Sequence, residues 1–298
     1  MNLTPSVGHS AAETAPASAP DPTPDRPSRW RRPLRLEIST LLSCLVILSV
    51  VAWALVPGFF TSASPVTGEA ADALQEPSAQ YWFGTDATGR DVFSRVVHGS
   101  VHSLSGALVA VTVGLVLGTL LGAVAGAVGG LVEDALMRVV DVLLAVPSLL
   151  LSLSVVIVLG FGTAQIAFAV GVASVAAFAR LARSEVVRVR GTDYVEAAYA
   201  SGGRFHTVLW RHVLPNSMTA VAALAALQFG TAILAISTLG FLGYGAPPPT
   251  PEWGLMIAEG RDYVATAWWL TTLPGLVVVA VVLAANRISA SIARRGRA

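Results

Sequence analysis

Long apolar runs dominate the hydropathy pattern of this chain. Six of them cover residues 38–58, 104–130, 142–160, 163–179, 217–243 and 264–285. A helix needs about 20 largely apolar residues to cross a hydrocarbon core of roughly 30 Å, and these runs reach or approach that length. They are continuous and do not alternate as the strands of a membrane barrel would. The predicted fold class is therefore all-α: a polytopic membrane protein with six transmembrane helices.

The third and fourth runs are separated only by Gly160, Phe161 and Gly162. This separation is typical of a tight turn, so the two runs predict a helical hairpin. The second and fifth runs, at about 27 residues each, exceed the minimum, which indicates a tilt or an extension beyond the bilayer.

Composition excludes a soluble globule. Of the 298 residues, 54% are hydrophobic and only 12% are charged, whereas soluble proteins carry about 25% charged residues. A net charge of +1 gives no bulk attraction to nucleic acid. The single cysteine, Cys44, lies in an apolar run and predicts no disulfide framework.

Basic residues predict the orientation of the helices. All 19 are arginines, and if the N-terminus lies inside, sixteen of them fall on the inner side and three, Arg90, Arg95 and Arg261, on the outer side. Because basic residues accumulate in cytoplasmic segments, both termini and the 180–216 loop are expected in the cytoplasm. The expected location is the bacterial plasma (inner) membrane, which the chain would cross several times.

Four segments follow from this pattern. Residues 1–36, rich in Pro and Ala, predict a disordered cytoplasmic tail, and they contain no apolar stretch of the kind found in a signal peptide. Residues 37–99 hold the first transmembrane helix and an external loop, residues 100–290 the transmembrane core, and residues 291–298 a basic cytoplasmic tail.

Glycines recur at every fourth position in the second run. They are Gly114, Gly118, Gly122, Gly126 and Gly130. On a helix they form a stripe without side chains against which another helix can approach closely. Permanent helix packing is the favoured interpretation, and a sliding surface for a helix that shifts during transport is the alternative.

The polar loop 180–216 predicts two short helices. Residues 194–200 suit the first, Gly202-Gly203 interrupts it, and Phe205, Val208 and Leu209 give the second an apolar face. Pro215 is expected to end the second helix and Asn216 to cap the next span. Such a helix–turn–helix elbow suits docking into a groove of a partner protein.

This elbow resembles the EAA loop of binding-protein-dependent ABC importer permeases. The resemblance rests on Glu196-Ala197-Ala198, Gly202 and Leu214-Pro215, with His212 where the family often has Ile. Residues 83–91 and 241–254 resemble two further segments of the second permease subunit of dipeptide, oligopeptide and nickel importers. The peptide and nickel branch also accommodates the His212 variation.

The resemblance implies a type I ABC importer permease fold in which the elbow is the coupling helix. The residues it implies for coupling to the ATPase are Glu196, Ala197, Ala198, Gly202, Leu214 and Pro215. The implied partners are a second permease subunit in a heterodimer, two ABC ATPase subunits, an extracytoplasmic solute-binding protein and membrane lipid. The chain has no Lys and no phosphate-binding loop, so it binds no cofactor itself and ATP and Mg belong to the partner ATPases.

Several other polar residues could have either a structural or a functional role. His98 and His102 have metal-ligand spacing but no third ligand nearby, so structural histidines are favoured over a metal site. Asp141 is expected to form an ion pair with Arg138 rather than to serve transport. Gln228, Thr231, Ser237 and Thr238 could equally line a pathway or make hydrogen bonds between helices.

The leading function is therefore the permease subunit of an ATP-driven importer for peptides or a related small solute, and not an enzyme. Nickel or another non-peptide solute is the alternative within the family. A membrane-embedded enzyme is disfavoured because the 5 histidines lie outside the six runs. A channel or secondary transporter would be expected to show internal repeats and would not need the long elbow.

Overall fold

The computed structural model describes residues 38–295, and side chains up to residue 292. The expected tail 1–36, with the arginines ahead of the first span, lies outside these residues, as do residues 296–298. The described part of the chain is helical and contains no strand, which confirms the all-α class. Its helices are α1 (Ile38–Leu55), α2 (Pro57–Phe60), α3 (Val92–Val128), α4 (Gly130–Ala145), α5 (Ser148–Leu159), α6 (Thr163–Arg190), α7 (Asp193–Ala200), α8 (Phe205–Val208), α9 (Leu214–Phe241), α10 (Trp253–Gly260) and α11 (Trp269–Arg295), with short turns η1 (Ala70–Asp72), η2 (Leu209–Val213) and η3 (Arg261–Tyr263).

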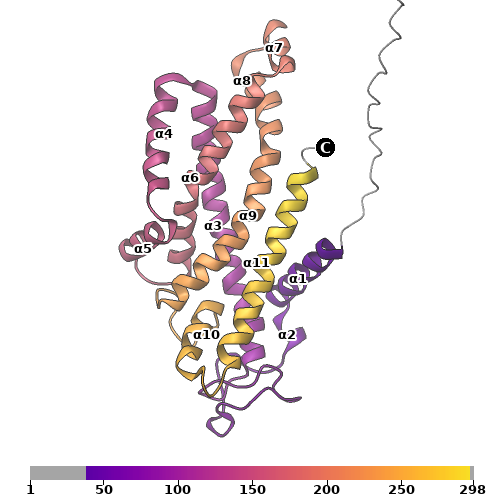
Figure 1. Ribbon diagram of the computed structural model, residues 1–298, viewed down its shortest axis with the longest axis vertical. Coiled ribbons are helices and arrows are strands. Elements are labelled where there is room, and N and C mark those ends of the chain that lie inside the picture. The colour runs from indigo at the N-terminus through magenta and orange to yellow at the C-terminus, as the bar shows by residue number, and fades with distance from the viewer. Residues whose placement is uncertain (1–37, 296–298) are drawn as a thin grey trace, which may run out of the picture. The chain divides into compact units, whose positions relative to one another are not determined.

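The long helices form a bundle with two distinct ends (Figure 1). We call the end that carries α7 and α8 the elbow end, and the opposite end, which carries α10 and the 61–91 loop, the cap end. Helix α3 packs along α6 and also contacts α9, while α11 packs between α9 and α1. The main apolar core includes Phe178, Ile233 and Trp253, from α6, α9 and α10.

The third predicted span is wrong as a single helix over 142–160. Within residues 38–295, five helices are long and apolar enough to cross a membrane, and α4 with α5 forms a sixth candidate bent by 96°. The bend falls at Val146-Pro147, where Pro147 has no N–H to donate and Val146 is extended, with φ −88° and ψ 129°. The predicted hairpin turn between α5 and α6 is confirmed, since Gly160 and Gly162 have φ of +90° and +137°.

Helix α3 begins well before the apolar run that predicted it. Asp91 caps its N-terminus by accepting hydrogen bonds from the backbone N–H groups of Phe93 (3.0 Å) and Ser94 (3.3 Å). The helix then continues for 37 residues to Val128. The expected segment boundary at 99/100 therefore falls inside α3.

The glycine stripe of α3 lies against α6. A Cβ atom added at Gly114, Gly118, Gly122 or Gly126 would overlap atoms of α6, at Ser174, Val175, Ala179 and Arg183 respectively. The backbones of the two helices are thus in direct contact. Gly130 is wrong as a fifth member of the stripe, because it begins α4 and has no atom within 4 Å of an added Cβ.

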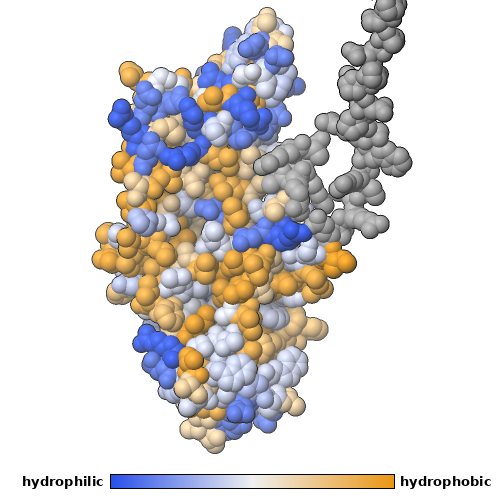
Figure 2. Space-filling view, viewed as in Figure 1, coloured by the Kyte–Doolittle hydropathy of each residue, from blue (hydrophilic) through white to orange (hydrophobic). Residues whose placement is uncertain are grey.

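Much of the bundle surface is apolar. Figure 2 shows hydrophobic residues around the middle of this face, with hydrophilic residues gathered mainly toward the two ends. Leu131 on α4 and Val158 on α5 are 87% and 85% exposed. An apolar surface of this extent suits contact with lipid or with another membrane subunit.

Asp141 and His98 each have a polar partner within the bundle. Asp141 pairs with Arg180 of α6 and not with Arg138, because α6 packs against α4 and brings a second arginine to it. His98 Nδ1 lies 2.9 Å from the backbone oxygen of Ser94, one turn earlier in α3.

Candidate functional site

The elbow is formed by α7, a glycine turn and α8. Gly202 has φ +84°, a left-handed conformation that residues with a side chain rarely adopt. The next residue, Gly203, packs closely against α7, since an added Cβ would lie 2.6 Å from the Ala198 carbonyl oxygen. The chain therefore reverses sharply between the two short helices.

The expected end of the second helix at Pro215 is wrong. From Phe205 the chain stays helical to Phe241 through a π-helical turn at Leu209–Val213. Pro215 is the second residue of α9 and follows the π turn inside this continuous helix, where it has no N–H to donate to the preceding turn. Asn216 is not an N-cap, since its Nδ2 donates to the His212 carbonyl oxygen at 2.6 Å inside this continuous helix.

A separate apolar cluster holds the elbow on the bundle. Its buried members are Ala127 of α3, Val186 and Val189 of α6, Val195 of α7, Val208 of α8 and Val213 of the π turn. Because one cluster joins the ends of α3 and α6 to both elbow helices, the elbow is packed as part of the bundle and not as a loose loop.

The residues of the EAA pattern divide between an outer and an inner face. Glu196, Ala197, Gly202 and Pro215 are exposed, whereas Ala198 and Leu214 are half-buried against the elbow cluster. Tyr194 and Trp210 add exposed aromatic surface nearby. The elbow thus presents small, acidic and aromatic groups outward, a surface suited to a protein partner.

A second candidate site is a groove of about 260 Å³ between α3, α5, α6 and α9. Gln228 and Thr231 line it, together with Ser148, Ser152 and Ser174. The Thr231 hydroxyl donates within α9 to Gln228 Oε1 (3.1 Å), and Ser152 donates to the Ser148 carbonyl oxygen (2.8 Å). These local bonds leave oxygen lone pairs available to a polar solute.

Ser237 does not line this groove. It is buried nearer the cap end, where the backbone of Ser237 contacts Gly254 of α10. Thr238 donates to the Leu234 carbonyl oxygen in its own helix at 2.8 Å. Tertiary packing thus separates the polar residues that the sequence grouped on one span.

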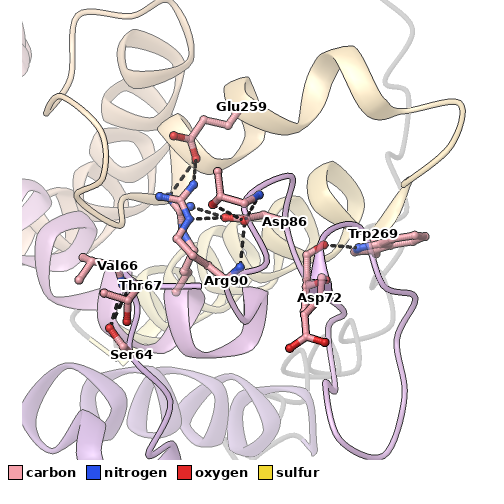
Figure 3. Close-up of polar contacts among 11 residues, drawn as sticks. Ser64, Val66, Thr67, Asp72, Asp86, Arg90, Glu259 and Trp269 are labelled. Atoms are coloured by element: carbon pink, nitrogen blue, oxygen red, sulfur yellow. Dashed lines mark hydrogen bonds and ion pairs between the residues drawn. The ribbon is translucent and has the colours of Figure 1, made fainter. Parts of the chain in front are cut away.

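The cap end contains a buried ion network centred on Asp86. Its Oδ2 accepts hydrogen bonds from Arg90 Nε and from Arg95 Nη1, each at 2.6 Å. Arg95 Nη2 also donates to Glu259 Oε2 at 2.9 Å. Residues of the 61–91 loop and α10 converge here (Figure 3). The network therefore joins the loop, α3 and α10.

The pKa of Asp86 is lowered by this environment. Burial by itself would raise the pKa, but hydrogen bonds from the Arg90 backbone and from Thr88, with the positive charge of Arg95, outweigh that effect. Asp86 is thus held as a carboxylate at neutral pH.

Comparison with known proteins identifies the family. Residues 118–297 match the family described as the binding-protein-dependent transport system inner membrane component. The chain is 37% identical over 283 residues to the dipeptide transport system permease protein DppC of Alkalihalophilus pseudofirmus, covering 92% of this chain and 93% of that protein. The chain belongs to this family.

Two further relatives of the permease have similar coverage. This chain is 40% identical to the glutathione transport system permease protein GsiD of Shigella flexneri, over 86% of this chain and 85% of that protein. It is 36% identical to the probable D,D-dipeptide transport system permease protein DdpC of Escherichia coli, over 83% of each. The resemblance noted in the sequence is confirmed, and the chain is a non-catalytic membrane subunit of an ABC importer.

Several polar groups of the permease were missed by reasoning from sequence. No local sequence signal joins Arg95 to Glu259, because the two residues are 164 positions apart in the chain. Glu252 is 1% exposed and caps α10 by accepting from the N–H groups of Gly254 (3.0 Å) and Leu255 (2.8 Å). The sequence signal for this cap is weak: an acidic side chain, Glu252, placed just before the start of a short helix.

Proposed function

We propose that this permease and a second permease subunit form the translocation path of an ATP-driven importer for peptides. The observation that carries the proposal is similarity over most of the chain to permeases named for dipeptide and glutathione transport. Glutathione is itself a small peptide, so these names agree on a solute class. A nickel importer is less well supported by these relatives.

In this proposal the elbow couples the permease to two ATPase subunits in the cytoplasm. The exposed Glu196 and the aromatic surface around it would enter a cleft of the ATPase. The elbow end is cytoplasmic, since its 180–216 segment carries six of the 19 arginines. Both chain ends then lie inside, and the cap end faces a solute-binding protein outside.

The groove between α5 and α9 supplies this subunit's part of the path. Gln228 and Thr231 offer hydrogen-bonding groups to a peptide backbone. The exposed apolar faces of α4 and α5 would contact the second permease, and the remaining apolar surface would contact lipid. A Gln228→Leu variant is expected to lower peptide uptake while still retaining the ATPase subunits.

The decisive experiment replaces Glu196 by Arg in the full transporter. If Glu196 meets basic groups of the ATPase, the like charge costs about 1–3 kcal/mol of binding. We expect normal amounts of permease in the membrane, loss of co-purifying ATPase subunits, and no stimulation of hydrolysis by loaded binding protein. Glu76→Arg, an exposed change in the cap-end loop, is the matched control for ATPase retention.

If Glu196→Arg retained the ATPase subunits and stimulated hydrolysis as wild type does, the coupling role of the elbow would be overturned. Uptake of a labelled dipeptide, with glutathione and a nickel chelate as competitors, tests the solute class. Uptake inhibited only by the nickel chelate would contradict the peptide assignment.

A further inference from the structure

Arg190 joins the base of the elbow to the end of another helix. It is the last residue of α6, and its Nη1 donates to the carbonyl oxygens of Gly126 and Ala127, each at 2.7 Å. These carbonyls belong to the last turn of α3, where no further helical N–H is available to them. The guanidinium therefore satisfies two backbone acceptors at the negative end of the α3 dipole.

The elbow begins immediately after this contact. Gly191 ends α6, Thr192 precedes α7, and α7 starts at Asp193. Ala127, whose carbonyl oxygen accepts one of the two hydrogen bonds from Arg190, also belongs to the elbow cluster with Val195 and Val208. Apolar contacts of this kind are not directional, whereas the planar, charged Arg190 side chain makes two directed hydrogen bonds to the end of α3.

The far end of α3 is also held by charged contacts. Arg95, 1% exposed, binds Asp86 and Glu259 in the cap-end network. Between Arg95 and Gly126, α3 is one uninterrupted helix, roughly 45 Å long at about 1.5 Å per residue. The glycine stripe keeps its backbone against α6 from Gly114 to Gly126.

We propose that Arg190 is a positioning residue that locks the elbow to α3, so that displacement of the elbow is carried along α3 to the cap-end ion network. This inference rests on the proposed coupling function. It adds a connection between the elbow end, which would bind the ATPase, and the cap end, which would meet the binding protein. The residue that makes this connection lies outside the EAA pattern.

The test compares Arg190→Ala and Arg190→Lys with Arg188→Ala in the full transporter in nanodiscs. Arg188 is the control because it lies two residues earlier, is exposed, and pairs with Glu185 in its own helix. After Cys44→Ala, spin labels at Val128 and Ala200, both exposed, report the distance between the end of α3 and the elbow.

For Arg190→Ala we expect a broadened distance distribution and a loss of about fivefold or more in stimulation of hydrolysis by loaded binding protein. Basal hydrolysis and ATPase retention stay close to wild type, because the exposed face of α7 is unchanged. Arg190→Lys, which keeps a charged donor, restores a large part of the stimulation, and Arg188→Ala behaves as wild type. If Arg190→Ala is not recovered from membranes, Arg190→Gln replaces it.

A narrow, wild-type distance distribution in the Ala variant, with or without loss of stimulation, would overturn the proposed lock. Wild-type stimulation in that variant would overturn it as well. Failure of the coupling function itself is distinguishable, since Glu196→Arg would then retain the ATPase subunits and support stimulation of hydrolysis as wild type does.

Discussion

Arg95 and Asp86 form an ion pair at the cap end, with Nη1 and Oδ2 separated by 2.6 Å, although the Arg95 side chain is only 1% exposed. Nine residues of sequence separate them, and a reversal of the chain before α3 brings them together. Glu259 of α10 completes the neutralisation of Arg95 from a distant part of the sequence. A buried guanidinium is tolerated here because two carboxylates accept its hydrogen bonds.

Replacing Asp86 by Asn is expected to destabilise the cap by about 3 kcal/mol, because a buried ion pair loses one charged partner. Thermal unfolding in detergent measures the loss. Asp72→Asn, which removes a half-buried carboxylate outside this network, is the control. Equal unfolding temperatures for wild type and Asp86→Asn would contradict the importance of the pair.

The same comparison should depend on pH in a defined direction. Since the folded state lowers the pKa of Asp86, its stabilisation is complete above the unfolded value of about 3.9 and is lost as pH falls through the lower folded value. The difference between wild type and Asp86→Asn should therefore be constant near neutral pH and shrink at strongly acidic pH. A difference that grew on acidification would show the opposite sign of the pKa shift.

Gly122→Ala is expected to prevent normal packing of α3 on α6. The added Cβ would overlap the Ala179 carbonyl oxygen and lie 2.8 Å from the Ala182 Cβ, so both backbones would have to move. Gly275→Ala in α11 is the matched control, because nothing lies within 4 Å of its added Cβ and Ala favours a helix by about 1 kcal/mol. Yield and unfolding temperature of the purified permease distinguish the two, and equal behaviour would argue against tight packing at Gly122.

Gly202→Val should distort the elbow without affecting membrane insertion. A β-branched residue at φ +84° is strained by about 1–2 kcal/mol, so the angle between α7 and α8 is expected to change. Ala200→Val, exposed at the end of α7, adds the same side chain without a left-handed backbone. Normal permease levels with reduced ATPase retention are expected only for Gly202→Val, and loss in both variants would point to side-chain bulk instead.

Cysteine accessibility tests the orientation. In a Cys44→Ala background, a cysteine at Glu76 in the cap-end loop should react with an impermeant reagent added to intact cells, and one at Ser201 in the elbow only after permeabilisation. Both positions are exposed, unlike Glu252, which is 1% exposed and would be a poor reporter. The reverse labelling pattern would invert the assignment of inside and outside.

The sequence by itself determined the helical class, five of the six predicted apolar crossings and the presence of an elbow. These properties depend on local composition and spacing: apolar runs of sufficient length, and a glycine pair between two short helical patterns. The family resemblance added the importer function, which comparison over most of the chain confirmed.

Tertiary structure decided the contacts between distant residues. Asp141 pairs with Arg180 instead of Arg138 because α6 packs beside α4, and Gly130 leaves the glycine stripe because the chain turns at Gly129. Pro215 continues a helix that its residue type suggested it would end, since the preceding π turn places it in the first turn of α9. Arg190 acquires its role only from the carbonyls of α3, which lie more than 60 positions earlier. Such partners depend on three-dimensional packing, which periodicity along a single chain does not encode.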